Sequence, residues 1–98
     1  GTPVIVVMGH ESCGAVTAAM QGGGDASPNL QHLVDHIEPA VKASGSTDVN
    51  EVVKKNVEQT KQDLIDRSTI IKNAFNKGDV KIVGAYYNLD GGQVDFLD

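Results

Sequence analysis

The sequence predicts an α/β fold, in which two parallel strands are joined by a helical crossover and an antiparallel hairpin strand lies at one edge. Val4 to Met8 is a continuous apolar run ended by Gly9, residues 28–76 carry helical periodicity, and residues 80–97 hold two further strand-like segments. A strand, helices and a second strand in this order require a crossover between parallel strands, which is right-handed. We therefore expect residues 1–98 to form a single domain.

The first strand is expected over Val4 to Met8. An unbroken Val/Ile run bounded by glycine is typical of a parallel strand that helices cover on both sides. We therefore expect this strand to be buried on both faces.

Two helices are expected next. Ala15 to Gln21 contains good helix formers and is stopped by the glycine triplet 22–24. Ser27 and Pro28 are typical of an N-cap and a first helical position. Apolar residues then recur on one helical face up to residue 41, and a bend or break is expected near Pro39. The residues of that face are Leu30, Leu33, Val34, Ile37 and Val41.

A long helix and a short one complete the crossover. Asp48 and Glu51 resemble a capping box before an apolar stripe that extends to Ile65. Ser68 is expected to cap a short helix over residues 69–76, ended by Lys77 and Gly78. Its inward-facing residues are expected to be Ile70, Ile71, Ala74 and Phe75.

The C-terminal segments predict a hairpin at the sheet edge. Val80 to Tyr87 is rich in β-branched and aromatic residues, and the turn 88–92 joins it to a strand over Gln93 to Leu97. Tyr86 and Tyr87 point to opposite sides of their strand, so one is expected to face the core and the other a helix or a partner.

The candidate site follows the first strand. His10 and Cys13 lie three residues apart at its carboxyl end, where ligands collect in parallel sheets. Imidazole and thiolate are both zinc ligands, and one turn can point both at a single ion. Gly14 has no β-carbon, so its backbone can approach an occupant, and an anion such as bicarbonate would suit its N–H. A catalytic zinc normally has three protein ligands, so two do not hold one firmly.

Residues 9–16, Gly-His-Glu-Ser-Cys-Gly-Ala-Val, resemble the second zinc-ligand motif of the β-class carbonic anhydrases. Residues 81–87 and 92–94 resemble the last two strands of that family, and Asn56-Val57 also resembles its counterpart. The resemblance implies a zinc enzyme that hydrates carbon dioxide reversibly to bicarbonate through zinc-bound hydroxide, with His10 and Cys13 as metal ligands. It covers only the C-terminal half of the family domain, since the sequence contains no Cys-x-Asp-x-Arg motif. That motif supplies a further ligand and an Asp–Arg pair, so we expect this chain alone to bind zinc weakly or not at all and to be inactive.

The missing half also bears on partners. In the family, the strand that carries the first cysteine lies beside the strand corresponding to Val4 to Met8, so this strand becomes an exposed apolar edge here. Exposed edges pair with other strands. We therefore expect a homo-oligomer formed through Val4 to Met8.

Composition restricts the other partners and the compartment. The net charge is −5 and no Lys/Arg cluster is present, which argues against nucleic acid and anionic membranes as partners. No apolar run is long enough to span a bilayer. The single cysteine cannot form an internal disulfide, which favours a reducing compartment such as the cytoplasm.

Four alternatives compete with the zinc site. His32 and His36 have a metal-binding spacing but fall beside the apolar stripe, so a solvated face is favoured. Glu11 could offer an oxygen to a metal, although the family does not use it. Cys13 could be a nucleophile, but the turn lacks the arginine that a phosphatase-like loop needs. Finally, the chain could be a catalytically silent α/β module whose role is assembly.

Overall fold

The computed structural model describes residues 3–23 and 27–97 and contains four helices and three strands within those ranges. The elements in chain order are β1 (Val4–His10), α1 (Gly14–Met20), α2 (Pro28–Ser44), α3 (Val49–Arg67), α4 (Thr69–Asn76), β2 (Lys81–Tyr87) and β3 (Val94–Phe96). Gly24, the last glycine of the predicted helix stop, lies outside the described residues, whereas Gln21 caps the C-terminus of α1.

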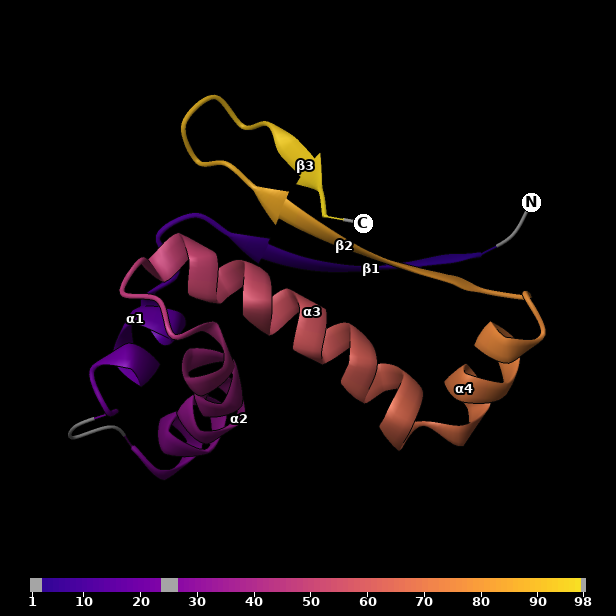
Figure 1. Ribbon diagram of the computed structural model, residues 1–98, viewed down its shortest axis with the longest axis horizontal. Coiled ribbons are helices and arrows are strands. Elements are labelled where there is room, and N and C mark those ends of the chain that lie inside the picture. Colours follow the sequence, from indigo (N-terminus) through magenta and orange to yellow (C-terminus); the bar gives the residue numbers. More distant parts are fainter. Residues whose placement is uncertain (1–2, 24–26, 98) are drawn as a thin grey trace.

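The predicted topology is confirmed. The strand order is β1-β2-β3, with β1 parallel to β2 in the register Val4↔Lys81 to His10↔Tyr87. β3 pairs antiparallel with β2, and Ala85 lies opposite Phe96. The helices α1, α2, α3 and α4 all lie on one side of this sheet, with α3 running beneath β1 and β2 (Figure 1). The sheet is therefore one layer and the helices are the other.

The expectation that β1 is buried on both faces is wrong. Val4, Val6 and Met8 are 53%, 51% and 57% exposed, while the residues between them are half-buried. The cause is the one-sided helix layer, because alternate side chains of a strand point to opposite faces. Together with Val94 and Phe96, which are also exposed, these three residues form what we call the outer sheet face.

The core lies between the helix layer and the inner face of the sheet. Val34 of α2 and Val52 and Val53 of α3 are its largest fully buried side chains. Tyr86 of β2 is buried against the same cluster, whereas Tyr87 is half-buried and belongs to the outer side of the strand. The prediction that one of the two tyrosines faces the core is confirmed for Tyr86, and a contact of Tyr87 with a partner stays a prediction.

The predicted helix starts are confirmed by their caps. The side chain of Ser27 accepts a hydrogen bond from Leu30 N at 3.3 Å, that of Ser68 accepts one from Ile71 N at 3.2 Å, and Asp48 accepts one from Asn50 N at 2.9 Å. Each bond satisfies a backbone donor that the first helical turn leaves without a partner.

The structure differs from two predictions about the helices. The break that was one of the two outcomes expected at Pro39 is absent, because α2 continues through it with Ile37 and Ala40 on either side buried against the core. The other expected outcome, a bend near Pro39, stays a prediction. In α4, Ile70 is 84% exposed and Phe75 is 40% exposed, although both were expected to face inward. The main packing partner of α4 is α3, so one side of this short helix cannot cover all of its apolar residues. Among the described residues, no helix is long and apolar enough to cross a membrane.

Candidate metal centre

The predicted ligand pair flanks a tight turn between β1 and α1. His10 is the last residue of β1, and Cys13 is the N-cap of α1. Ser12 between them has φ of 57°, a left-handed conformation that is uncommon for residues other than glycine. This turn (residues 11–13), which we call the ligand turn, ends the strand and starts the helix within three residues.

The side chain of His10 is available to a metal through one nitrogen. His10 is exposed, and its Nδ1 lies 3.0 Å from the carbonyl oxygen of Glu11. With Nδ1 protonated and donating to that carbonyl, Nε2 carries the free lone pair. A backbone carbonyl on the second ring nitrogen is the arrangement that usually fixes the tautomer of a metal-binding histidine.

Cys13 is a half-buried free thiol packed against the core cluster. Its backbone is fixed by Thr17, whose N–H and hydroxyl both donate to the Cys13 carbonyl, at 3.0 and 2.9 Å. The cysteine therefore has a defined backbone position at the start of α1.

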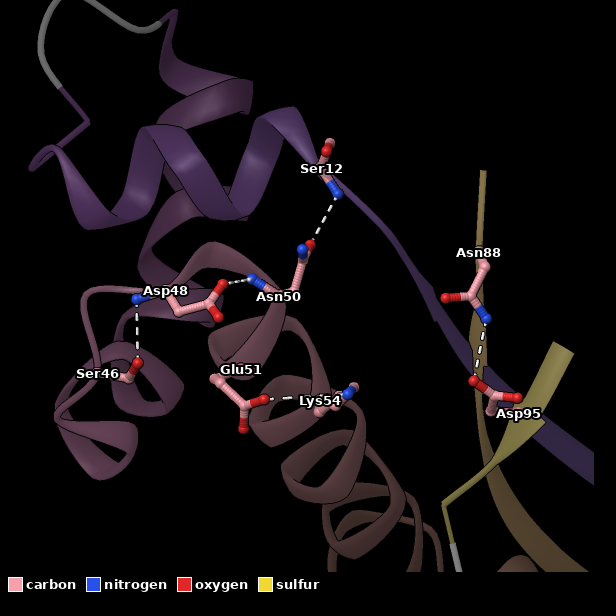
Figure 2. Close-up of polar contacts among 8 residues, drawn as sticks. All are labelled: Ser12, Ser46, Asp48, Asn50, Glu51, Lys54, Asn88 and Asp95. Atoms are coloured by element: carbon pink, nitrogen blue, oxygen red, sulfur yellow. Dashed lines mark hydrogen bonds and ion pairs between the residues drawn. The ribbon is translucent and has the colours of Figure 1, made fainter. Parts of the chain in front are cut away.

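The ligand turn is also attached to two distant segments. Ser12 N–H donates to Asn50 Oδ1 at 3.0 Å, as Figure 2 shows, which ties the turn to the start of α3. Glu11 Oε1 accepts hydrogen bonds from Leu89 N at 2.9 Å and Asp90 N at 3.3 Å, in the loop between β2 and β3. Asn50 and this loop were missed from the sequence, since nothing local links positions 38 to 79 residues apart.

Gly14 is exposed and begins α1. A β-carbon built at this position would meet nothing within 4 Å. The space beside Gly14 is therefore open, and packing among the described residues does not require a glycine there. Its predicted contact with an anion stays a prediction.

The donors suit zinc in type but not in number. Within residues 3–23 and 27–97, no three His, Cys, Asp or Glu side chains gather in a group that could hold a metal ion. His10 and Cys13 are the kinds of ligand that zinc takes, and a catalytic zinc at this turn would need a third protein donor besides them.

His32 and His36 lie on the solvated surface of α2, as expected. Both are exposed, their rings pack edge to face at 4.6 Å, and Nδ1 of His36 lies 3.0 Å from the carbonyl oxygen of His32. These two histidines contact each other and not the ligand turn.

Tyr86 is the titratable group with the clearest perturbation near this end of the sheet. Burial raises the pKa of its phenol above 10.0, and the negative charges of Glu11, Asp48, Glu51 and Asp95 raise it further. Lys54 Nζ lies 4.8 Å from the centre of the Tyr86 ring. Figure 2 shows that Lys54 is also paired with Glu51. The tyrosine is therefore neutral at physiological pH.

A cavity lies away from the ligand turn. A hollow of about 610 Å³ lies between α3, the end of α2 and β2, and its lining includes Lys54, Lys61 and Gly84 but neither candidate ligand. Within the ligand turn, Ser12 is exposed and Glu11 and Cys13 are half-buried, so the turn lies at the surface of the described chain.

Comparison with known proteins identifies the family. The family model described as carbonic anhydrase matches residues 1–94. Carbonic anhydrase 2 of Mycobacterium tuberculosis is 35% identical over 102 residues, which cover 98% of this chain and 49% of the relative. The carbonic anhydrase of Mycolicibacterium smegmatis is 35% identical over 99 residues, covering 95% of this chain and 48% of the relative. The chain therefore belongs to the carbonic anhydrase family.

Solved structures define the fold as that of the β class. The β-carbonic anhydrase CcaA superposes with a TM-score of 0.80 at 20% identity, over 97% of this chain and 50% of that protein. The β-carbonic anhydrase CafD of Aspergillus fumigatus superposes with a TM-score of 0.72 at 18% identity, over 98% of this chain and 57% of that protein. The chain spans about half the length of the curated relatives that it matches.

Proposed function

We propose that the chain carries half of a β-carbonic anhydrase active centre, in which His10 and Cys13 are two of the protein ligands of zinc and Gly14 lies beside carbon dioxide or bicarbonate. The observation that carries this proposal is the ligand turn at the carboxyl end of β1, in a chain that belongs to the carbonic anhydrase family. Zinc, when bound, supplies a hydroxide nucleophile near neutral pH.

The chain's own residues do the binding and orienting in this proposal. Nε2 of His10 is left free by the contact of Nδ1 with a carbonyl, and Cys13 is fixed at the start of α1. Open space beside Gly14 leaves room for a small anion. Since the sequence has a single cysteine and no Cys-x-Asp-x-Arg motif, the third ligand and the Asp–Arg pair must come from another polypeptide segment. We propose that residues 1–98 form one domain. Without the segment that supplies the third ligand, we expect this domain to have no carbonic anhydrase activity.

A homo-oligomer through β1 is part of the same proposal. β1 is the end strand of the described sheet, and Val4, Val6 and Met8 expose apolar side chains on it. An uncovered apolar edge strand is a ready template for another strand. We propose the cytoplasm as the compartment, because a reducing environment keeps the single thiol available.

A catalytically silent assembly module is the second candidate. It is favoured by the shortage of donors within the described part of the chain, since two ligands do not make a catalytic zinc site. The exposed edge of β1 would then be the functional feature.

The zinc affinity of residues 1–98 separates the two candidates, because neither of them predicts that this chain alone hydrates carbon dioxide. For the zinc proposal we expect weak zinc binding, no activity, and an increase in the zinc dissociation constant in His10→Ala of more than about tenfold, because even outer partners of a ligand are worth 10–100-fold. His32→Ala, at an exposed histidine of α2, is the matched control and should bind zinc like the wild type. A metal-free wild-type chain, or equal zinc affinity in both variants, supports the assembly module.

A further inference from the structure

Glu11 lies between the two candidate ligands and connects them to the rest of the fold. Its N–H donates to Tyr87 O at 2.9 Å, which continues the pairing of β1 with β2 beyond the end of the strand. Its carbonyl oxygen faces His10 Nδ1 at 3.0 Å, and its carboxylate accepts from Leu89 N and Asp90 N. The main chain and side chain of one residue thus contact the ligand, the neighbouring strand and the hairpin loop.

The contact of the Glu11 carboxylate with Leu89 N, at 2.9 Å, is a strong hydrogen bond, and the contact with Asp90 N, at 3.3 Å, is a weaker one. Hydrogen bonds from backbone amides to an ionised carboxylate are roughly twice as strong as those between neutral groups. They join positions 78 and 79 residues apart, so they fix the turn relative to the whole sheet and not only to its neighbours. An oxygen that accepts from two amides also has its lone pairs engaged, which makes Glu11 Oε1 a poor metal ligand.

The opposite side of the turn is held by Asn50. Ser12 N–H donates to Asn50 Oδ1, and Asn50 N–H in turn donates to Asp48 at the cap of α3 (Figure 2). Ser12 needs such support because its left-handed φ of 57° is unfavourable for a residue with a side chain. The ligand turn is therefore held on one side by the hydrogen bond of Ser12 to Asn50 and on the other by the hydrogen bonds of Glu11 to the hairpin loop.

We propose that Glu11 is a positioning residue, which holds the backbone of the ligand turn against the loop at residues 88–92 and so fixes the separation of His10 and Cys13. It acts through the turn and not as a ligand. The role toward zinc rests on the proposed function above, whereas the anchoring of the turn can be measured without metal.

Two variants at Glu11 and one control test this role. Glu11→Ala removes the oxygen that accepts both hydrogen bonds. Glu11→Gln keeps an acceptor oxygen without the charge, and Glu58→Ala removes the same charge from an exposed ion pair with Lys55 on α3. Amide hydrogen exchange at Leu89, Asp90 and Ser12 is measured on metal-free protein, and zinc affinity is measured by competition with a chelator. Circular dichroism establishes that each variant is folded.

In Glu11→Ala we expect amide exchange at Leu89 and Asp90 to be about tenfold faster than in the wild type. We also expect zinc to bind about tenfold more weakly, which is the smallest effect usual for a residue that supports a metal ligand. In Glu11→Gln we expect about a threefold change in both, because the neutral bonds are roughly half as strong. Glu58→Ala should match the wild type. A role limited to global stability would raise exchange throughout the core and would not follow this order.

The outcomes separate the inference from the proposed function. Absence of zinc binding by the wild type contradicts the proposed function, and the exchange data then decide the inference alone. Wild-type exchange at Leu89 and Asp90 in Glu11→Ala overturns the inference, and so does unchanged affinity in a wild type that binds zinc. If Glu11→Ala does not fold, the comparison of Glu11→Gln with Glu58→Ala gives the same decision.

Discussion

Replacement of Gly9 by alanine should destabilise the fold, because two valine side chains of α3 pack directly against this glycine of β1. A β-carbon at Gly9 would lie 2.5 Å from Val53 Cγ1 and 2.9 Å from Val57 Cγ2. Both valines are buried, so neither can turn outward. Overpacking of this kind costs about 1–3 kcal/mol, and the lower entropy of the unfolded alanine chain returns about 0.4–1 kcal/mol. Two simultaneous clashes place the net loss near 2 kcal/mol, a large share of the roughly 5–15 kcal/mol that stabilises a typical domain.

Urea unfolding of Gly9→Ala measures this loss as a lower midpoint with an unchanged m-value. Gly14→Ala is the matched control, because its new methyl group meets nothing within 4 Å, and it should be as stable as the wild type or up to about 1 kcal/mol more stable. Val53→Ala in the Gly9→Ala background removes the closest methyl group and should give a coupling free energy above about 0.5 kcal/mol. A Gly9→Ala chain as stable as Gly14→Ala would refute the close packing of α3 on β1.

Two further predictions concern Tyr86 and the outer sheet face. Because the pKa of Tyr86 is raised in the folded state, stability should be intact below pH 10.0 and fall as pH rises from there through the folded-state pKa, where the unfolded chain releases its proton first. Urea midpoints against pH should show this fall in the wild type and a smaller one in Tyr86→Phe, and equal falls would contradict it. Val6→Lys places a charge on the exposed edge strand and should shift micromolar sedimentation from oligomer to monomer, while Asn29→Lys on α2 should not. A monomeric wild type would show that β1 does not associate.

Local signals predicted the elements well. Serine and aspartate are common N-cap residues, and their positions in the sequence predicted three helix starts. The structure has a helix after each of these caps, Ser27, Asp48 and Ser68. The predictions that were wrong concerned burial, which depends on how the sheet and the helices are layered. A run of valines does not reveal whether helices cover one face of a strand or two, and the apolar stripe of α4 does not reveal that Ile70 has nothing above it.

The sequence likewise predicted one part of the candidate site, the ligands, and not the other, the contacts that support them. His10 and Cys13 could be found from spacing and chemistry because both belong to one short motif. Their support could not, since Asn50 and the amides of Leu89 and Asp90 reach the turn only through the tertiary fold. Every residue except proline has a backbone N–H, so the sequence does not indicate which of these groups donate to the turn.

The hydrogen bonds of Glu11 to the hairpin loop have a consequence for the order of folding. The bond to Leu89 spans 78 residues, and β1 pairs with β2 only after the four helices between them have been synthesised. Contacts of such high sequence separation require costly loop closure and form slowly. The ligand turn therefore leaves the ribosome well before the hairpin loop that holds it, and it cannot reach its folded conformation until that loop has been synthesised.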